Sequence, residues 1–175
     1  MERSDLATRA RRAYELGRLR ATLPVALFAV PPAVVALQIC GGGALTVGLA
    51  VLLAAALVAA HWRGEEAAKG AGAGLLAGAF AFLVPVVANG TGLCPLSASP
   101  LMLALCCGGG VASGGVLALC ALRRPTRAPL YLLAGGVVAV LTGGLGCLIA
   151  GFAGLAGVTA GIAFGLAPAM RLART

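Results

Sequence analysis

Charged residues in this 175-residue chain are gathered in four clusters, and long charge-free stretches separate the clusters. The clusters lie within residues 1–20, 63–69, 123–127 and 171–174, and the stretches between them, 21–62, 70–122 and 128–170, contain 42, 53 and 43 residues. An unpaired charge at the centre of a bilayer costs about 2.5–3.5 kcal/mol on an insertion scale, so such stretches suit a membrane interior. One span needs about 20 apolar residues, and each stretch therefore predicts two spans joined by a short turn.

Composition excludes a soluble domain. The chain is 61% hydrophobic and 10% charged, whereas roughly a quarter of the residues of a soluble domain are charged. We therefore expect an all-α fold, a polytopic transmembrane helix bundle of six spans with glycine- and proline-rich turns. The expected segments are a basic N-terminal helix at 1–21, a membrane domain at 22–170 and a tail at 171–175. Within the membrane domain we expect spans at 22–40, 44–62, 71–88, 100–122, 130–148 and 151–169. The expected turns between paired spans are Gly41–Gly43, Asn89–Pro100 and Gly143–Gly151.

The distribution of charge also predicts an orientation. Cytoplasmic loops carry an excess of Lys and Arg, and with both termini in the cytoplasm (N-in, C-in) all 13 basic and all 5 acidic residues lie on that side. The net charge of +8 then reflects basic loop ends next to anionic lipid, and we expect the lipid bilayer, not nucleic acid, as partner. Arginine far outnumbers lysine, and Ala, Gly and Val are abundant, which indicates a GC-rich genome. We therefore expect the inner (cytoplasmic) membrane of a bacterium.

Glycines recur every fourth residue in three of the expected spans, and each set forms a smooth stripe along its helix. Helices in lipid associate through close backbone approach, which small residues permit, so we predict that the stripes are helix-packing surfaces. A pore lining or a sliding surface is the functional alternative. The stripes are Gly70, Gly74 and Gly78; Gly110 and Gly114; and Gly157, Gly161 and Gly165.

The interiors of the expected spans contain no Asp, Glu, Lys or Arg. Ion-coupled transport usually requires ionisable groups inside the membrane, and most hydrolases require a base. We therefore expect neither an enzyme nor an ion-coupled transporter, and we assign no catalytic residue. The one histidine, His61, precedes Trp62 at the cytoplasmic end of the second span, a position typical of an interfacial anchor.

Cysteine is the remaining reactive residue type, and five of the six cysteines fall in the outer half of the expected bundle. Cys40 and Cys147 end spans, Cys94 lies in the longest outer turn, and Cys106 and Cys107 lie about 9 Å deeper, at about 1.5 Å per residue from Pro100. Three interpretations are open. The cysteines are small apolar packing residues, or they form a structural disulfide such as Cys40–Cys94 or Cys94–Cys147, or they form a cluster that responds to a soft metal ion or an oxidant. No other cofactor is expected.

The N-terminal segment predicts a weakly amphipathic basic helix. Such a helix acts either as a topogenic anchor on the membrane surface or as a docking helix for a cytoplasmic protein. The candidate binding residues for a protein partner are Arg9, Arg11, Arg12 and Tyr14.

A short basic N-terminus, six compact spans and outward cysteines together resemble the layout of the multi-pass anti-sigma factors, which hold extracytoplasmic-function sigma factors at bacterial membranes. The resemblance implies that the four N-terminal residues bind a sigma factor and that Cys40, Cys94 and Cys147 sense metals or oxidants. The leading hypothesis is therefore a non-enzymatic regulator whose outer thiols control a cytoplasmic partner. The alternatives are a small permease or soft-metal transporter, with capture at Cys94 and relay through Cys106 and Cys107, and a structural subunit of a membrane complex.

Overall fold

The computed structural model describes residues 2–40, 43–90, 100–123, 128–148 and 151–172, which form helices and short connections and no strand. The elements are α1 (Glu2–Thr22), the 3₁₀-helix η1 (Leu23–Ala29), α2 (Val30–Cys40), α3 (Ala44–Arg63), α4 (Glu65–Gly90), α5 (Pro100–Leu122), α6 (Ala128–Cys147) and α7 (Gly151–Leu172). The predicted all-α class is confirmed.

Five helical stretches are long and apolar enough to cross a membrane. They are Arg12–Ile39, Ala44–Arg63, Glu65–Ala88, Leu103–Leu122 and Pro129–Cys147, and α7 contains a shorter apolar stretch, Gly151–Ala167. A chain with this set of helices is a multi-pass membrane protein. Five of the six predicted spans correspond to these five long stretches, and the range predicted for the sixth, 151–169, corresponds to the shorter one in α7.

The predicted boundary between the basic helix (1–21) and the first span (22–40) falls where α1 ends, at Thr22, and η1 begins. α1 continues through η1 into α2, and the apolar stretch begins at Arg12, inside the predicted basic helix. The 3₁₀ geometry of η1 has a local cause. Pro31 has no N–H to donate to the carbonyl of Leu27, which instead accepts the N–H of Val30, three residues on.

One predicted turn begins later than expected, because α4 continues to Gly90 and Asn89 is helical. The range predicted for the fifth span, 130–148, agrees with α6, and residues 143–147, which also begin the predicted turn Gly143–Gly151, are helical and buried. Glycine ends helices in water, but in a membrane the backbone hydrogen bonds of a helix have no competing solvent. Residues 41–42, 91–99 and 149–150, which belong to the three predicted turns, lie outside the described residues.

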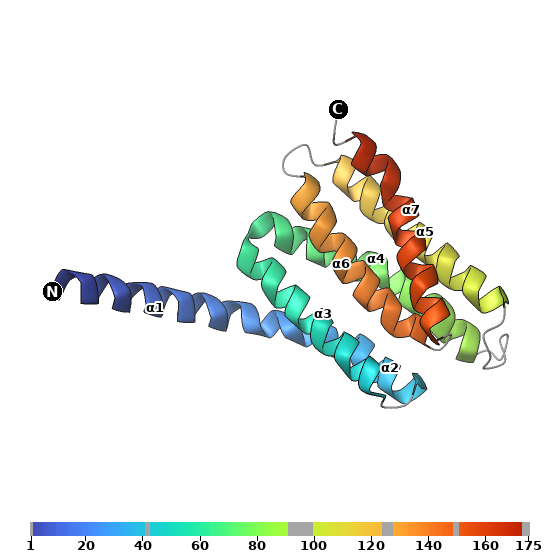
Figure 1. The fold of residues 1–175 in the computed structure, drawn as a ribbon, viewed down its shortest axis with the longest axis horizontal. Coiled ribbons are helices and arrows are strands. Elements are labelled where there is room, and N and C mark those ends of the chain that lie inside the picture. The colour runs from blue at the N-terminus through green and yellow to red at the C-terminus, as the bar shows by residue number, and fades with distance from the viewer. Residues whose placement is uncertain (1, 41–42, 91–99, 124–127, 149–150, 173–175) are drawn as a thin grey trace.

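The helices form three layers (Figure 1). α4 and α6 are the central pair; α5 and α7 pack on one side of it, and η1, α2 and α3 pack on the other. Buried apolar side chains fill the two spaces between layers. One core includes Leu117, Val158 and Ile162, and the other includes Leu53 and Val138. Residues of α4 and α6 contribute to both cores, so this pair connects the two outer layers.

The two ends of the bundle differ in charge. Figure 1 shows that the ends of α3 and α5, the beginnings of α4 and α6 and the last turns of α7 lie at one end. This end, which we call the charged end, carries Arg63, the Glu65–Lys69 ion pair and Arg123. α1 runs away from the bundle as a separate rod (Figure 1). The helix ends that lead into the other connections lie at the opposite end.

Candidate functional site

The thiols of Cys106 and Cys147 meet inside the bundle. Cys106 lies in the second turn of α5, Cys147 is the last residue of α6, and both side chains belong to the same buried core, where their thiols lie close enough to interact. Both side chains are completely buried, at 0% exposure. The pair lies toward the end of the bundle opposite the charged end. We call Cys106 and Cys147 the thiol pair, and it is the candidate functional site.

Glycines near the thiol pair let α4, α5 and α6 approach each other. A Cβ on Gly109, three residues after Cys106, would lie 3.2 Å from the Cα of Ala81 on α4. A Cβ on Gly143, four residues before Cys147, would lie 2.8 Å from the Cβ of the same alanine. Only glycine at these two positions allows both helices to contact α4 at Ala81. Close packing of this kind brings the two sulfurs together.

The other cysteines are placed differently. Cys107 is half-buried beside α7, where a Cβ on Gly157 would lie 3.0 Å from its Sγ. Cys120 is half-buried and packs against the core between α4, α5, α6 and α7. The side chain of Cys40 and the whole of Cys94 lie outside the described residues. Of the five cysteines predicted as metal or redox candidates, the structure therefore brings together Cys106 and Cys147.

Cys147, one member of the predicted disulfide Cys94–Cys147, is a free thiol in the structure, and Cys94 lies outside the described residues. The cysteine that lies beside Cys147 is Cys106 on α5. The sequence carries no signal for this contact, because the two cysteines are far apart in the chain and their approach depends on how α5 and α6 pack. The orientation of a cysteine around its helix is predictable, whereas the identity of the facing helix is not.

Two thiols in contact support two kinds of chemistry. They can be oxidised to a disulfide, or their sulfurs can together hold a soft cation. In the part of the chain that the structure describes, no group of three or more His, Cys, Asp or Glu side chains is placed to hold a metal ion. Because both thiols are buried, a reagent must be small or apolar to reach them.

The first predicted glycine stripe, Gly70, Gly74 and Gly78 on α4, faces α6. Cβ atoms on Gly70 and Gly74 would overlap the backbone of Tyr131 and Gly135 on α6, and a Cβ on Gly78 would lie 2.8 Å from the Cβ of Thr142. α4 and α6 therefore touch backbone to backbone along three helical turns. We observe a helix-packing surface here, not a pore lining.

The other two predicted stripes face each other across the α5–α7 contact. A Cβ on Gly110 would lie 3.2 Å from the Cα of Gly161, and a Cβ on Gly114 would lie 3.0 Å from the Cα of Gly165. Gly157, at the start of the α7 stripe, contacts Cys107 as described above. The sequence showed which residues form each stripe but not which stripes meet.

One packing stripe was missed. The face of α6 that receives α4 is formed by Gly135, Ala139, Thr142 and Gly146, at spacings of four, three and four residues. Its signal is visible only when Ala and Thr are counted with Gly as small residues.

The predicted partner-binding residues lie on the separate rod formed by α1. Arg9, Arg12 and Tyr14 are exposed, and 69% of the Tyr14 surface is accessible. The side chain of Arg11 lies outside the described residues. α1 contacts the rest of the protein mainly through η1 and α3, so most of its surface is available to a partner.

His61 and Trp62 occupy the last turn of α3, at the charged end. The Nδ1 atom of His61 lies 3.0 Å from the carbonyl oxygen of Leu57 in its own helix. The ring therefore bonds locally within α3, in keeping with an interfacial position rather than with ligation.

Comparison with known proteins does not assign the chain to a family. We find no matching protein-family model, no matching curated protein and no matching solved structure. The layout resemblance to anti-sigma factors stays a prediction, and functional interpretation depends on the geometry of the thiol pair and of α1.

Proposed function

We propose that this protein is a non-enzymatic regulator of the anti-sigma type in the inner membrane of a bacterium. It crosses the membrane six times, with both termini in the cytoplasm. α1 binds a cytoplasmic protein such as a sigma factor, and the thiol pair responds to an oxidant or a soft metal ion. The burial of Cys106 and Cys147 side by side in one core is the observation that supports this proposal most directly.

Oxidation of the thiol pair supplies the sensing step. An oxidant of the quinone or disulfide class takes two electrons and two protons from the two S–H groups, and a bond forms between the Sγ atoms of Cys106 and Cys147. The oxidant leaves as a hydroquinone or a dithiol. In the proposed orientation the pair lies in the half of the bundle nearer the oxidising periplasm, and quinones dissolve in the bilayer around it.

A change at the thiol pair can reach α1 through α6. Leu145, two residues before Cys147, is buried in the same core as Ala29 of η1. η1 continues directly from α1, so a shift of α6 moves the base of the rod. Forming a sulfur–sulfur bond draws α5 and α6 together, because bonded sulfurs lie only about 2 Å apart. Packed helices respond to such shifts by moving as rigid bodies from one discrete arrangement to another.

The output is binding at α1. The exposed side chains of Arg9 and Arg12 offer two positive charges, and Tyr14 offers an apolar ring with a hydrogen-bonding hydroxyl. Arginine and tyrosine are enriched among residues that dominate protein interfaces. α1 therefore has the chemistry of a protein-docking helix as well as that of a membrane anchor.

Co-purification tests the proposal. The full chain and a chain that lacks residues 1–20 are purified with a soluble sigma factor of the extracytoplasmic-function class, before and after treatment with a membrane-permeant thiol oxidant. We expect only the full chain to retain the sigma factor, and we expect oxidation to release it. Equal retention by the two chains would rule out docking at α1.

Cysteine variants separate sensing from docking. Cys106→Ser and Cys147→Ser should each retain the sigma factor and fail to release it on oxidation. Cys120→Ser is the matched control, since Cys120 lies apart from the thiol pair, and it should release the sigma factor as the unmodified chain does. Release that persists in Cys106→Ser would exclude the thiol pair as the sensor.

Metal uptake separates the regulator from the transporter alternative. A chain in which all six cysteines are replaced by serine removes every proposed capture and relay thiol. Cells that express this variant are expected to accumulate Cu(I) at the same rate as cells that express the unmodified chain. A clear fall in uptake would favour a soft-metal transporter.

A further inference from the structure

Two apolar cavities flank α3 at the charged end of the bundle. The larger, of about 540 Å³, lies between α3 and η1 and includes Val58, Trp62 and Ala26. The smaller, of about 220 Å³, lies between α3 and α6 and includes Ala56 and Leu133. Both are open at the protein surface, so each is a groove that faces the membrane.

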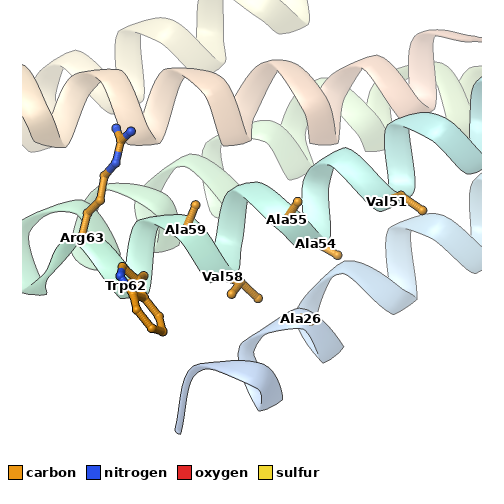
Figure 2. Close-up of a pocket in the computed structure, with 8 residues that line it drawn as sticks. All are labelled: Ala26, Val51, Ala54, Ala55, Val58, Ala59, Trp62 and Arg63. Carbon is orange, nitrogen blue, oxygen red and sulfur yellow. The ribbon is translucent and has the colours of Figure 1, made fainter. Parts of the chain in front are cut away.

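The two grooves share two residues of α3. Ala59 and Arg63 line both of them, and Ala55 continues the same line one turn earlier, at a spacing of four residues. All three residues are exposed. Figure 2 shows Ala55, Ala59 and Arg63 along one side of α3, with Val58 and Trp62 on the side that faces η1. The alanines make a low ridge between the grooves, and Arg63 stands at the end of that ridge.

Among the described residues that line either groove, Arg63 is the only charged one. The nearest basic side chain along the chain after it, Lys69, is in an ion pair of 2.5 Å with Glu65. The arrangement therefore presents one guanidinium above two strips of apolar surface. A guanidinium binds a phosphate through two parallel hydrogen bonds, and apolar strips bind hydrocarbon.

The length of the larger groove matches one leaflet of a bilayer. Val51, which also lines it, is twelve residues before Arg63, or about 18 Å along the helix axis at 1.5 Å per residue. Half of a hydrocarbon core of about 30 Å is about 15 Å. With Arg63 and Trp62 at the interface, the groove reaches from the headgroup level to the middle of the membrane.

The geometry points to a binding site for one anionic diacyl phospholipid. The headgroup phosphate lies on Arg63, one acyl chain lies in the groove toward η1, and the other lies in the groove toward α6. The ridge of Ala55 and Ala59 separates the two chains. Selectivity for an anionic over a zwitterionic headgroup comes from the guanidinium, because the contacts of the acyl chains with the apolar walls are the same for both lipids. The site does not depend on the regulatory role proposed above.

Trp62 provides a direct test, because it is the single tryptophan of the chain and lines the larger groove. The purified full chain is reconstituted in phosphatidylcholine vesicles that contain increasing fractions of brominated phosphatidylglycerol or of brominated phosphatidylcholine. We expect brominated phosphatidylglycerol to quench Trp62 fluorescence at about a fivefold lower mole fraction, which corresponds to about 1 kcal/mol. Equal quenching by the two lipids would overturn the proposal.

Variants distinguish a lipid bound at Arg63 from general attraction of anionic lipid to a basic protein. Arg63→Gln should reduce the fivefold preference to about one, and Arg63→Lys should keep part of it. Arg123→Gln is the matched control, because Arg123 is exposed at the same end of the bundle and lines neither groove. A preference that survives Arg63→Gln, or that is lost equally in Arg123→Gln, contradicts the site. Insensitivity of Trp62 to both lipids would show that protein covers the groove, and it too contradicts the site.

Discussion

The hydroxyl of Ser113 on α5 donates a hydrogen bond of 2.5 Å to the main-chain carbonyl oxygen of Ala77 on α4. Both residues are completely buried, and the bond joins the central pair of helices to the α5–α7 layer. Hydrogen bonds between helices in membranes contribute about 0.6 kcal/mol on average and about 1.7 kcal/mol at most. This contact therefore fixes the register of α5 on α4 more than it adds to stability.

Replacing Ser113 by alanine removes this bond without adding bulk. We expect the free energy of unfolding to fall by about 0.6–1.7 kcal/mol, because the partner carbonyl keeps its bond within α4. Denaturant unfolding in mild detergent measures the change. Thr159→Ala is the control, since the Thr159 hydroxyl bonds only to the carbonyl of Leu155 in its own exposed helix face, at 2.7 Å. Equal losses in the two variants would show that the bond between helices has no special role.

Gly74 provides a sharper test of the α4–α6 contact. A Cβ at this position would lie 2.7 Å from the Cα of Gly135 and would overlap its carbonyl oxygen, so Gly74→Ala must push the two helices apart. We expect a loss of about 1–3 kcal/mol, the usual cost of overpacking, in the same unfolding measurement. Gly72→Ala, two residues away on the same helix, meets no atom within 4 Å and should leave stability unchanged or slightly higher. A similar loss in both variants would mean that contact with α6 does not account for the requirement for glycine at position 74.

The positions of the helices follow from the sequence because charge and apolar length are local properties. The range predicted for the second span, 44–62, corresponds to α3 at Ala44–Arg63, since both ends are marked by glycine or charge. Residues 143–147 are a different case, because the sequence places them both in the predicted span 130–148 and in the predicted turn Gly143–Gly151, and the structure places them in α6. A glycine-rich segment indicates a turn in water, whereas in a membrane the same residues remain helical and form a contact surface.

The pairing of helices does not follow from the sequence. Stripes of small residues fit any other such stripe, so the sequence did not show that Gly74 meets Gly135 or that Gly114 meets Gly165. The thiol pair depends on this pairing, because Cys147 meets Cys106 only when α5 and α6 both pack on α4. Residue type alone therefore predicts the cysteines as candidate metal or redox residues. Which two of them lie side by side depends on how the helices pack.

Oxidative crosslinking tests the contact between the two thiols. In a chain that keeps Cys106 and Cys147 and carries serine at the other four cysteines, a membrane-permeant oxidant should form an intramolecular disulfide. Peptide mass spectrometry without reduction detects the linked fragments of α5 and α6. A chain that keeps Cys106 and Cys120 is the control, and we expect no link in it. Failure to link Cys106 with Cys147 under conditions that oxidise exposed thiols would contradict their contact.

Cysteine labelling tests the proposed orientation. Gly43 precedes α3 and Arg123 follows α5, both residues are exposed, and three helices separate them. Gly43→Cys adds a side chain that meets no atom within 4 Å, and its backbone is in an extended conformation that any residue adopts. We introduce Gly43→Cys and Arg123→Cys separately into a chain without other cysteines and treat intact cells with a membrane-impermeant maleimide.

With both termini in the cytoplasm, the reagent should label the Gly43→Cys chain in intact cells and the Arg123→Cys chain only after the membrane is opened. The reverse pattern would place the termini outside and would leave α1 on the wrong side for a sigma factor. Labelling of both chains in intact cells would mean that α3, α4 and α5 do not all cross the membrane. The result therefore decides the orientation before any partner is sought, because docking at α1 requires α1 to lie in the cytoplasm.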